Sequence, residues 1–132
     1  MALETGMTHT LTVKVDTALS AEEYGNEGFA VLATPALVGL MERCAIESLA
    51  PSLQPGQGSV GIHIGIDHLA ATPLGFTATV TCTLTAIEDR ILHFAIEASD
   101  GMDLIARATH RRAIVDMAKF QARLGAKAAK AS

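Results

Sequence analysis

The sequence predicts an α+β domain in which one antiparallel sheet of about five strands wraps around a single long apolar helix. Two observations lead to this prediction. Several segments alternate apolar and polar residues with the period of a strand, whereas one segment is apolar at the 3.6-residue period of a helix. With 132 residues, the chain is long enough for one domain with a proper core and too short for two. We therefore expect residues 1–132 to form a single domain.

The N-terminal part supplies one strand and one loop. A half-buried strand is predicted over residues 8–16, where Leu11, Val13 and Val15 share one face. Residues 17–29 are polar and contain two glycines, which predicts a loop or a short mobile helix. This loop has the least predictable structure in the chain.

The apolar helix is predicted to begin at Thr34 and Pro35 and to end before Pro51. A threonine cap followed by proline at the first helical position is a common helix start. Residues 51–58, with the sequence PSLQPGQG, predict a turn-rich connection to the next strand.

Four further strands are predicted, joined mostly by short turns, over residues 59–70, 76–87, 91–98 and 104–115. In the first of them, alternation places Val60, Ile62, Ile64 and Ile66 on one face. The tail from Met117 is predicted to be an alanine-rich helix. A helix that is apolar nearly all round needs cover over most of its circumference, which a wrapped sheet provides. This arrangement is the hotdog fold. Because its sheet usually joins that of a second subunit, we expect a homodimer.

The composition argues against several classes of protein. Hydrophobic residues make up 49% of the chain and charged residues 18%, with a formal charge of −4, so we expect neither a disordered chain nor a nucleic-acid binder. No apolar run reaches the roughly 18 residues needed to cross a bilayer, so no membrane association is expected. The N-terminus has neither the basic start nor the apolar core of a signal peptide, which predicts a cytoplasmic protein.

The cysteines and histidines predict no metal site and no reactive thiol. Cys44 and Cys82 lie inside apolar patterns, one on a helix and one on a strand, and we expect both to be buried and inert. A disulfide or a nucleophilic cysteine is the alternative, although no CxxC spacing or activating base accompanies either residue. The five histidines have neither HxxxH nor HExxH spacing.

Glu42 stands out because it lies in the middle of the apolar helix. At the helical period it shares a stripe with apolar or small residues, namely Val38, Gly39, Ala45 and Ile46. A carboxylate on a buried stripe costs several kcal/mol unless it is paired, hydrogen-bonded or neutralised. Glu42 is therefore either a functional carboxylate or a structural one that an arginine or backbone amides satisfy.

Strand alternation also places His68 on the face that packs against the helix, at the point where the strand ends. A histidine beside a buried glutamate is a plausible acid–base or carbonyl-polarising group near neutral pH, with a core histidine bonded to backbone as the alternative. Thr34 is explained as a helix cap or as part of the same site. Thr34 and Glu42 on one straight helix would be roughly 12 Å apart along its axis. A shared site then requires Thr34 to fold back in the loop, or the groups to come from two subunits.

Three runs of the sequence, ATPALVGLMERC, PGQGSVGIHIGIDHLAATPLG and ATHRRAIV, resemble the fluoroacetyl-CoA thioesterase type of hotdog protein, over roughly residues 30–120. In that family a threonine, a glutamate eight residues on and a histidine at the end of the next strand form the catalytic group. Thr34, Glu42 and His68 match this pattern with the same spacing. The resemblance further implies that Gly61 and Arg112 line the substrate pocket.

The sequence departs from the family in the segment before Thr34. The fluoroacetyl-specific enzyme carries a lid with phenylalanines there, and this chain has Tyr24, Gly25, Gly28 and Phe29. Glycines stand where the lid phenylalanines are expected, and Phe29 is shifted relative to those places. We therefore expect a short or medium acyl group other than fluoroacetyl, with Phe29 among the substrate-binding residues.

The implied reaction is hydrolysis of an acyl-CoA thioester, in which coenzyme A is part of the substrate and no other cofactor takes part. Glu42 would act as nucleophile, forming a mixed anhydride, or as general base on water, and both roles are left open. His68 would polarise the thioester carbonyl or protonate the departing thiolate. Thr34 would position Glu42 or the acyl group, and Gly61 would leave room for the acyl carbonyl. Arg112 would meet a substrate oxygen or the pantetheine, unless it is an ordinary ion-pairing arginine.

Two other functions compete with hydrolysis. One is a non-catalytic hotdog module that binds acyl-CoA or another small apolar ligand, because the fold does not fix the function. The other is hydration of enoyl thioesters, which the thioesterase-like segment from Thr34 to Glu42 disfavours. The basic residues of the C-terminal helix are interpreted as a solvated face or as an attraction for the CoA phosphates; they are Lys119, Arg123, Lys127 and Lys130.

Overall fold

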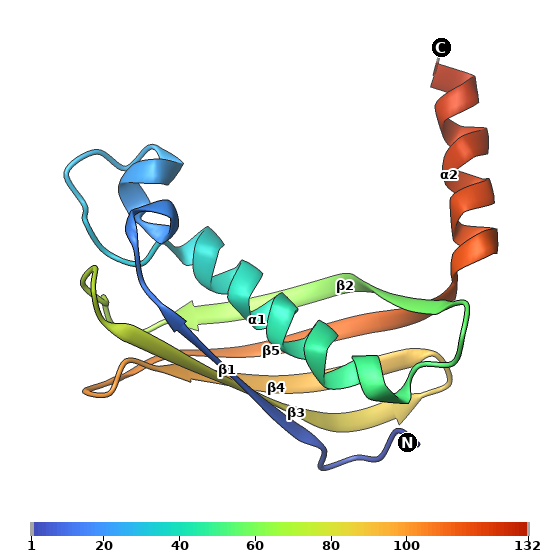
Figure 1. Cartoon of the computed structure of the whole chain (residues 1–132), viewed down its shortest axis with the longest axis horizontal. Coiled ribbons are helices and arrows are strands. Elements are labelled where there is room, and N and C mark those ends of the chain that lie inside the picture. The colour runs from blue at the N-terminus through green and yellow to red at the C-terminus, as the bar shows by residue number, and fades with distance from the viewer. Residues whose placement is uncertain (1, 132) are drawn as a thin grey trace.

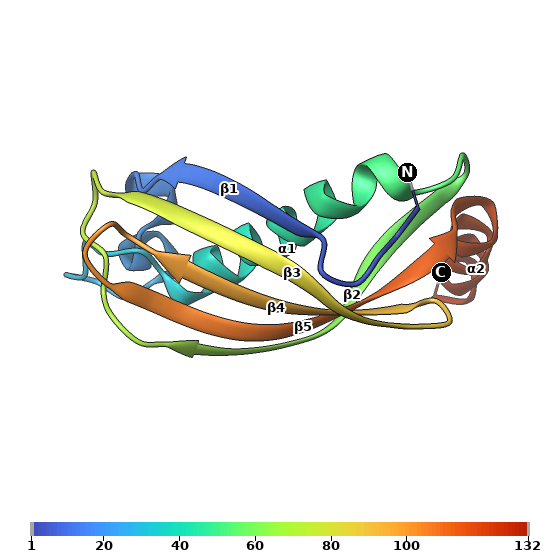
Figure 2. The same ribbon diagram turned by 90° about the horizontal axis from the view of Figure 1, so that it is seen from below.

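The computed structural model describes residues 2–131, which form one antiparallel sheet with a long helix across its face and a second helix at the C-terminus (Figure 1). The strands are β1 (Thr8–Lys14), β2 (Gln57–His68), β3 (Thr77–Glu88), β4 (Ile91–Ser99) and β5 (Leu104–Asp116), and the helices are α1 (Thr34–Leu49) and α2 (Met117–Ala131). The order in the sheet is β1-β3-β4-β5-β2, so β1 and β2 are the edge strands (Figure 2). The predicted class and order of elements are confirmed.

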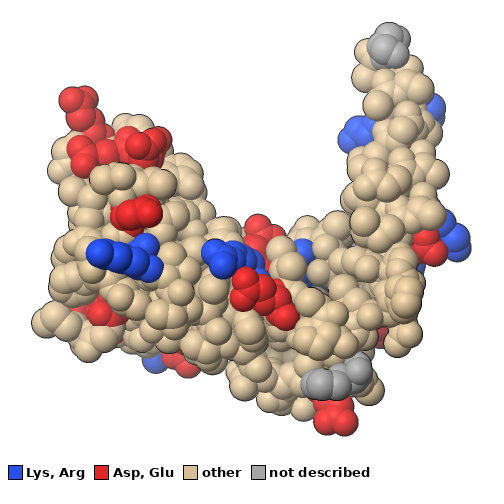
Figure 3. All heavy atoms as spheres, in the orientation of Figure 1, with Lys and Arg blue, Asp and Glu red and all other residues tan. Residues whose placement is uncertain are grey.

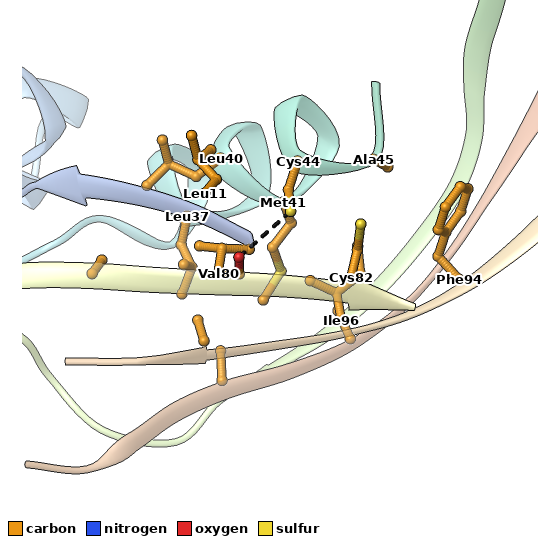
Figure 4. Close-up of a cluster of buried hydrophobic side chains, with 14 of the residues drawn as sticks. Leu11, Leu37, Leu40, Met41, Cys44, Ala45, Val80, Cys82, Phe94 and Ile96 are labelled. Carbon is orange, nitrogen blue, oxygen red and sulfur yellow. Dashed lines mark hydrogen bonds between the residues drawn. The ribbon is translucent and has the colours of Figure 1, made fainter. Parts of the chain in front are cut away.

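One face of α1 packs against the inner surface of the sheet. Leu37, Met41 and Cys44 follow one another by turns along this face and are fully buried, close to Val80 and Cys82 of β3 (Figure 4). Truncating a leucine or methionine to alanine in such a core costs about 2–5 kcal/mol. The contact between α1 and the middle of the sheet therefore fixes the helix, and with it the side chains along the helix edges.

The opposite side of α1 is open within one chain. Gly39 is exposed, Ile46 is 47% exposed and the side chain of Glu42 is 40% exposed. The predictions that the sheet covers most of the helix and that Glu42 is buried are therefore wrong for the single chain. The reason is geometric, because the five strands curve around one side of α1 only (Figure 1).

The start of α1 differs from the predicted one. Ala33 is the cap residue and Thr34 is the first helical residue, and no side chain caps the helix. The carbonyl oxygen of Ala33 accepts the first helical hydrogen bond from the amide of Leu37 at 2.9 Å, and Pro35 lies in the first turn, where its missing N–H costs nothing. The interpretation of Thr34 as the cap is wrong, because its hydroxyl bonds to another element.

A β-bulge in β2 changes the predicted alternation. The register with β5 shifts between Gly61 and His63, so Ile62 is an extra residue and is 47% exposed. Beyond the bulge, Ile64, Ile66 and His68 share the helix-facing side. Before the bulge that side carries Ser59 and Gly61, which are paired with Ile114 and Arg112 of β5. The prediction for His68 is thus confirmed, whereas Val60 and Ile62 do not share its face.

The loop between β1 and α1 is built from two short 3₁₀ turns, Thr17–Leu19 and Ala21–Tyr24. The side chains of Asp16 and Ser20 each accept a hydrogen bond from a backbone amide at the start of these turns. Isolated bridges join Ser20 to Leu32 and Val31 to Pro73. The loop is thereby fastened to the end of the sheet at which β2 finishes.

Cys44 and Cys82 are free thiols and are fully buried, as predicted. The sulfur of Cys44 donates to the carbonyl oxygens of His9 and Val80 at 3.4 and 3.5 Å. A hydrogen bond with Cys82 and burial both raise the pKa of Cys44, so its thiol stays protonated at neutral pH.

Acidic and basic side chains are unevenly distributed. Acidic residues stand out on the loop before α1, among them Glu22 and Glu23, whereas α2 carries three lysines and one arginine and no acidic residue within Met117–Ala131 (Figure 3). None of the helices described between residues 2 and 131 is long and apolar enough to cross a membrane.

Candidate active site

Thr34 and His68 meet where α1 begins and β2 ends. The hydroxyl oxygen of Thr34 lies 2.7 Å from Nδ1 of His68. Burial of the imidazole lowers the pKa of His68, so the ring is neutral at neutral pH. The second ring nitrogen, Nε2, is buried and makes no close hydrogen bond with the described residues, and the backbone of Ala70 offsets part of the effect of burial on the pKa of the ring. A buried nitrogen without a partner is costly, and it is a natural place for a ligand atom to bind.

An open hollow of about 460 Å³ adjoins this pair. Its walls come from the loop before α1 and from the segment after β2, and apolar residues predominate in them: Tyr24, Val31, Leu32, Leu69 and Ala70, besides Thr34 and His68. Gly25 and Gly28 have positive φ angles of 94° and 90°, and a Cβ atom on either would meet no atom within 4 Å. Phe29 is 54% exposed and does not line this hollow.

A second polar cluster surrounds Glu42 in the middle of α1. Nη1 of Arg112 lies 3.3 Å from Oε2 of Glu42, and Arg112 is only 3% exposed. Burial lowers the pKa of Arg112 and the charge of Glu42 raises it, and a guanidinium stays protonated in either case. Glu42 thus has the arginine partner expected of a structural carboxylate. It also keeps an accessible side, which a purely structural ion pair does not need.

Gly61 of β2 lies against this ion pair. A Cβ atom at this position would clash with Oε2 of Glu42, and it would lie 3.3 Å from Nη1 of Arg112 and 3.4 Å from Cε1 of His110. Glycine is therefore the residue that lets the carboxylate approach the backbone of β2. Gly61 and Arg112, both predicted to line a substrate pocket, are found together at Glu42.

One chain does not bring Glu42 to Thr34 and His68. Thr34 belongs to α1 itself and does not fold back, so eight residues of regular helix, about 12 Å of rise, separate it from Glu42. Of the three predicted catalytic residues, the structure unites Thr34 with His68 and places Glu42 with Gly61 and Arg112.

Two residues of the second cluster were missed from the sequence. His110 and Ser59 both bind Arg112, with His110 two residues before it on β5 and Ser59 on the neighbouring strand. Alternation along β5 gives His110 the parity of Arg112, so this signal was available. Ser59 could not be paired with Arg112 without the order of the strands in the sheet.

Known proteins share this architecture and much of the sequence. Residues 13–118 match the family described as fluoroacetyl-CoA-specific thioesterase. The fluoroacetyl-CoA thioesterase of Streptantibioticus cattleyicolor is 46% identical over 94 residues, which cover 71% of this chain and 68% of that protein.

Solved structures agree with this match. A crystal structure of a mutant fluoroacetyl-CoA-specific thioesterase has a TM-score of 0.90 and 36% identity, with 96% of this chain and 98% of that one covered. A hot-dog-like protein from Thermanaerovibrio acidaminovorans has a TM-score of 0.89 at 22% identity, covering 95% and 93% of the two chains, and shows the fold alone. The chain has the hotdog fold and belongs to the fluoroacetyl-CoA-specific thioesterase family.

Proposed function

We propose that this protein hydrolyses short or medium acyl-CoA thioesters at a site that Thr34 and His68 of one protomer share with Glu42 of a second copy. The observation that carries the proposal is the hydrogen bond between Thr34 and Nδ1 of His68, beside an apolar hollow, with the buried Nε2 free of close partners among residues 2–131. Membership of a thioesterase family supports the reaction type.

The hydrogen bonds suggest how the imidazole would act. If the Thr34 hydroxyl donates to Nδ1, neutral His68 carries its proton on Nε2 and can donate it to the thioester carbonyl oxygen. This donation would stabilise the negative charge that develops on that oxygen in the transition state. Thr34 would then fix the tautomer and orientation of His68, and so take part in positioning rather than in bond breaking.

Glu42 would supply the carboxylate. It would attack the thioester carbon to form a mixed anhydride and release the thiolate of coenzyme A, which takes up a proton; water would then hydrolyse the anhydride, releasing the acid and restoring the carboxylate. Alternatively it would remove a proton from a water molecule that attacks the thioester carbon, and the proton would pass to the departing thiolate. Arg112 and Gly61 orient the carboxylate in both cases. Arg112 would thus act through Glu42 rather than bind a substrate oxygen.

A homodimer would complete the site. The uncovered side of α1, with Gly39, Glu42 and Ile46, and the edge strand β2, with exposed Ile62, offer a surface that a second copy can cover. A two-fold axis makes each contact occur twice, so two complete sites would form. The position of Thr34 within α1 supports the two-subunit alternative from the sequence, in which the three residues come from two copies.

The hollow within one chain supports an acyl group longer than two carbons. Val31, Leu32 and Leu69 would contact the acyl chain, and the glycines at 25 and 28 place no side chain at those two positions of the loop. Each buried methylene contributes about 0.8 kcal/mol, or about a fourfold gain in kcat/KM, until the hollow is filled. Three expectations from the sequence stay predictions. They are a role for Phe29 in substrate binding, an attraction of the CoA phosphates by the basic residues of α2, and a cytoplasmic location.

A panel of straight-chain acyl-CoA esters with detection of released thiol tests the proposal. We expect turnover that rises with chain length through the short acyl groups and is lost in Glu42→Gln and His68→Ala. Tight binding without thiol release on every ester would instead support a binding module. Hydration of crotonyl-CoA without thiol release would support a hydratase.

A further inference from the structure

The inner face of β5 buries two polar side chains beside each other. His110 is 1% exposed and Arg112 is 3% exposed, on a face that otherwise carries buried alanines at positions 106 and 108. A buried charge or an unsatisfied buried donor is expensive, so the hydrogen bonds of this pair must be specific. These hydrogen bonds also reveal which ring nitrogen of His110 carries the proton, because one partner can only accept a hydrogen bond and the other can only donate one.

The two partners of His110 fix its tautomer. Nδ1 of His110 lies 2.7 Å from the backbone carbonyl oxygen of His63, which can only accept, so Nδ1 carries the proton. Nε2 of His110 lies 3.2 Å from Nη1 of Arg112, which can only donate, so Nε2 is bare. Both contacts are satisfied by the neutral Nδ1–H form alone. A doubly protonated ring would direct an N–H at the guanidinium and place two cations in contact.

Arg112 is held on both sides by these groups. Its Nε and Nη2 donate to Ser59, at 2.9 Å to the hydroxyl and 3.1 Å to the carbonyl oxygen. Its Nη1 donates to Nε2 of His110 and to Oε2 of Glu42. Ser59 therefore fixes one edge of the guanidinium, and His110 occupies the Nη1 hydrogen that Glu42 does not use.

We propose that His110 is a positioning residue for Glu42: as the neutral Nδ1–H tautomer, it accepts the second Nη1 hydrogen of Arg112 and so directs the first at one carboxylate oxygen. Without that acceptor, a buried N–H would be left unpaired, and the guanidinium would turn toward the remaining oxygen of Glu42 to satisfy it. The carboxylate would then lose its single fixed orientation. The kinetic part of this inference rests on the proposed function, whereas the tautomer is a property of the resting protein.

The tautomer can be read directly by long-range ¹H–¹⁵N correlation of the histidine rings in ¹⁵N-labelled protein, with His110→Gln used to assign the signals. We expect His110 to carry its proton on Nδ1 and not to titrate between about pH 6 and pH 8. An Nε2–H tautomer, or a ring that becomes doubly protonated in this range, would overturn the assignment. If the wild type releases no thiol from any acyl-CoA, the proposed hydrolysis fails and this measurement still decides the state of His110.

Two substitutions separate positioning from packing. In His110→Gln the amide group falls at the place of Nε2 and can accept from Arg112, whereas in His110→Asn the amide falls at the place of Nδ1 and can serve only His63. We expect His110→Gln to keep kcat within a few fold and His110→Asn to lower kcat on the order of 10²-fold with KM nearly unchanged. His93→Gln is the matched control, because His93 lies on the outer side of β4 beside Glu88.

A comparison of kcat between the two His110 variants decides the kinetic part of the proposal. Equal kcat losses in His110→Gln and His110→Asn, at similar melting temperatures, would mean that His110 serves packing only and would overturn it. A loss confined to KM would overturn it as well, since a misdirected carboxylate slows the chemical step rather than binding. Unchanged activity in His93→Gln would show that the kcat losses come from replacing a histidine on the inner face of the sheet and not from replacing any histidine of the sheet.

Discussion

The two halves of the candidate site are held in opposite ways. Around Glu42, the guanidinium of Arg112 makes four hydrogen bonds, to Ser59 twice, to His110 and to the carboxylate. At the start of α1, a single hydrogen bond joins Thr34 to His68, and Nε2 of His68 has no partner among the described residues. The first half is saturated with contacts and the second is left open.

This difference matches the roles proposed for the two groups: the carboxylate of Glu42 carries the charge, and the imidazole of His68 contacts the substrate. A carboxylate needs a fixed orientation, which a buried neighbour with several hydrogen bonds provides. An imidazole that donates to a substrate carbonyl needs a free N–H beside an apolar space. The loop before α1 lines the hollow of the open half and supplies none of the four hydrogen-bond contacts of Arg112, so the acyl group can be accommodated there without disturbing Arg112 and Glu42.

The largest effect is expected from Glu42→Gln. The amide oxygen can still accept from Arg112, so the melting temperature should change little, whereas kcat should fall on the order of 10³-fold because the base or nucleophile is lost. Thiol release and thermal unfolding of the same preparation measure both. Activity within tenfold of the wild type would remove Glu42 from the chemistry.

Gly61→Ala should disturb the saturated half next most strongly. The added Cβ would clash with Oε2 of Glu42, so we expect kcat to fall on the order of 10²-fold and stability to drop by about 1–3 kcal/mol. Gly125→Ala on exposed α2 is the matched control, since a Cβ there meets nothing within 4 Å. It should leave activity unchanged and raise helix stability by up to about 1 kcal/mol. Equal behaviour of the two variants would contradict the close approach at Gly61.

Thr34 should affect activity more than folding. Thr34→Val removes the hydroxyl that bonds His68 and is expected to lower kcat roughly tenfold, while Thr34→Ser keeps the hydroxyl and most of the activity. Because Thr34 does not cap α1, urea unfolding of Thr34→Val should show only the loss of its hydrogen bond to His68, about 0.5–1.5 kcal/mol. The same loss in a His68→Ala background, where that bond is already absent, would restore Thr34 as the cap.

The smallest predicted effect is on the pH dependence of stability. Burial lowers the pKa values of His110 and His68 below the ordinary 6.5, so the folded protein binds fewer protons than the unfolded chain in acid. The two neutral histidines contribute fully to the free energy of unfolding above about pH 6.5. This contribution is lost as the pH falls toward their lowered pKa values, and each histidine accounts for less than about 1.4 kcal/mol per pH unit. The charged or titratable groups that act on His110 are Arg112, Glu42 and His63.

Urea unfolding of the wild type and of His110→Gln, from about pH 7 to pH 5, tests this dependence. The variant should show a flatter profile, because one of the two histidines no longer takes up a proton on unfolding. A steeper or unchanged profile would show that His110 is not held neutral in the fold.

The periodic parts of the sequence were sufficient to predict the fold. Alternation located every strand, and the single apolar helix placed Glu42 correctly at its middle. The predictions failed in two places: where an extra residue interrupted the alternation of a strand, and where a side chain formed a tertiary hydrogen bond in place of the expected local one. The extra residue Ile62 reverses the alternation within β2, and the hydroxyl of Thr34 bonds His68 instead of an amide of its own helix. A periodic pattern carries no information on either event.

The candidate site was predicted in pieces. The spacing of Thr34, Glu42 and His68 could be recognised from the sequence, but the separation of Glu42 from the other two depends on α1 starting at Thr34. The network around Arg112 depends on β2 and β5 being neighbours, which follows from the strand order and not from any local pattern.

The most direct test of the two-part site mixes two inactive variants. Glu42→Gln and His68→Ala are co-refolded in equal amounts so that subunits exchange, and thiol release is compared with that of each variant alone. If the site joins Glu42 of one protomer to His68 of its partner, half of the dimers regain one of their two sites, and roughly a quarter of wild-type activity returns. A mixture as inactive as its components, with mixed dimers verified by mass spectrometry, would contradict the account.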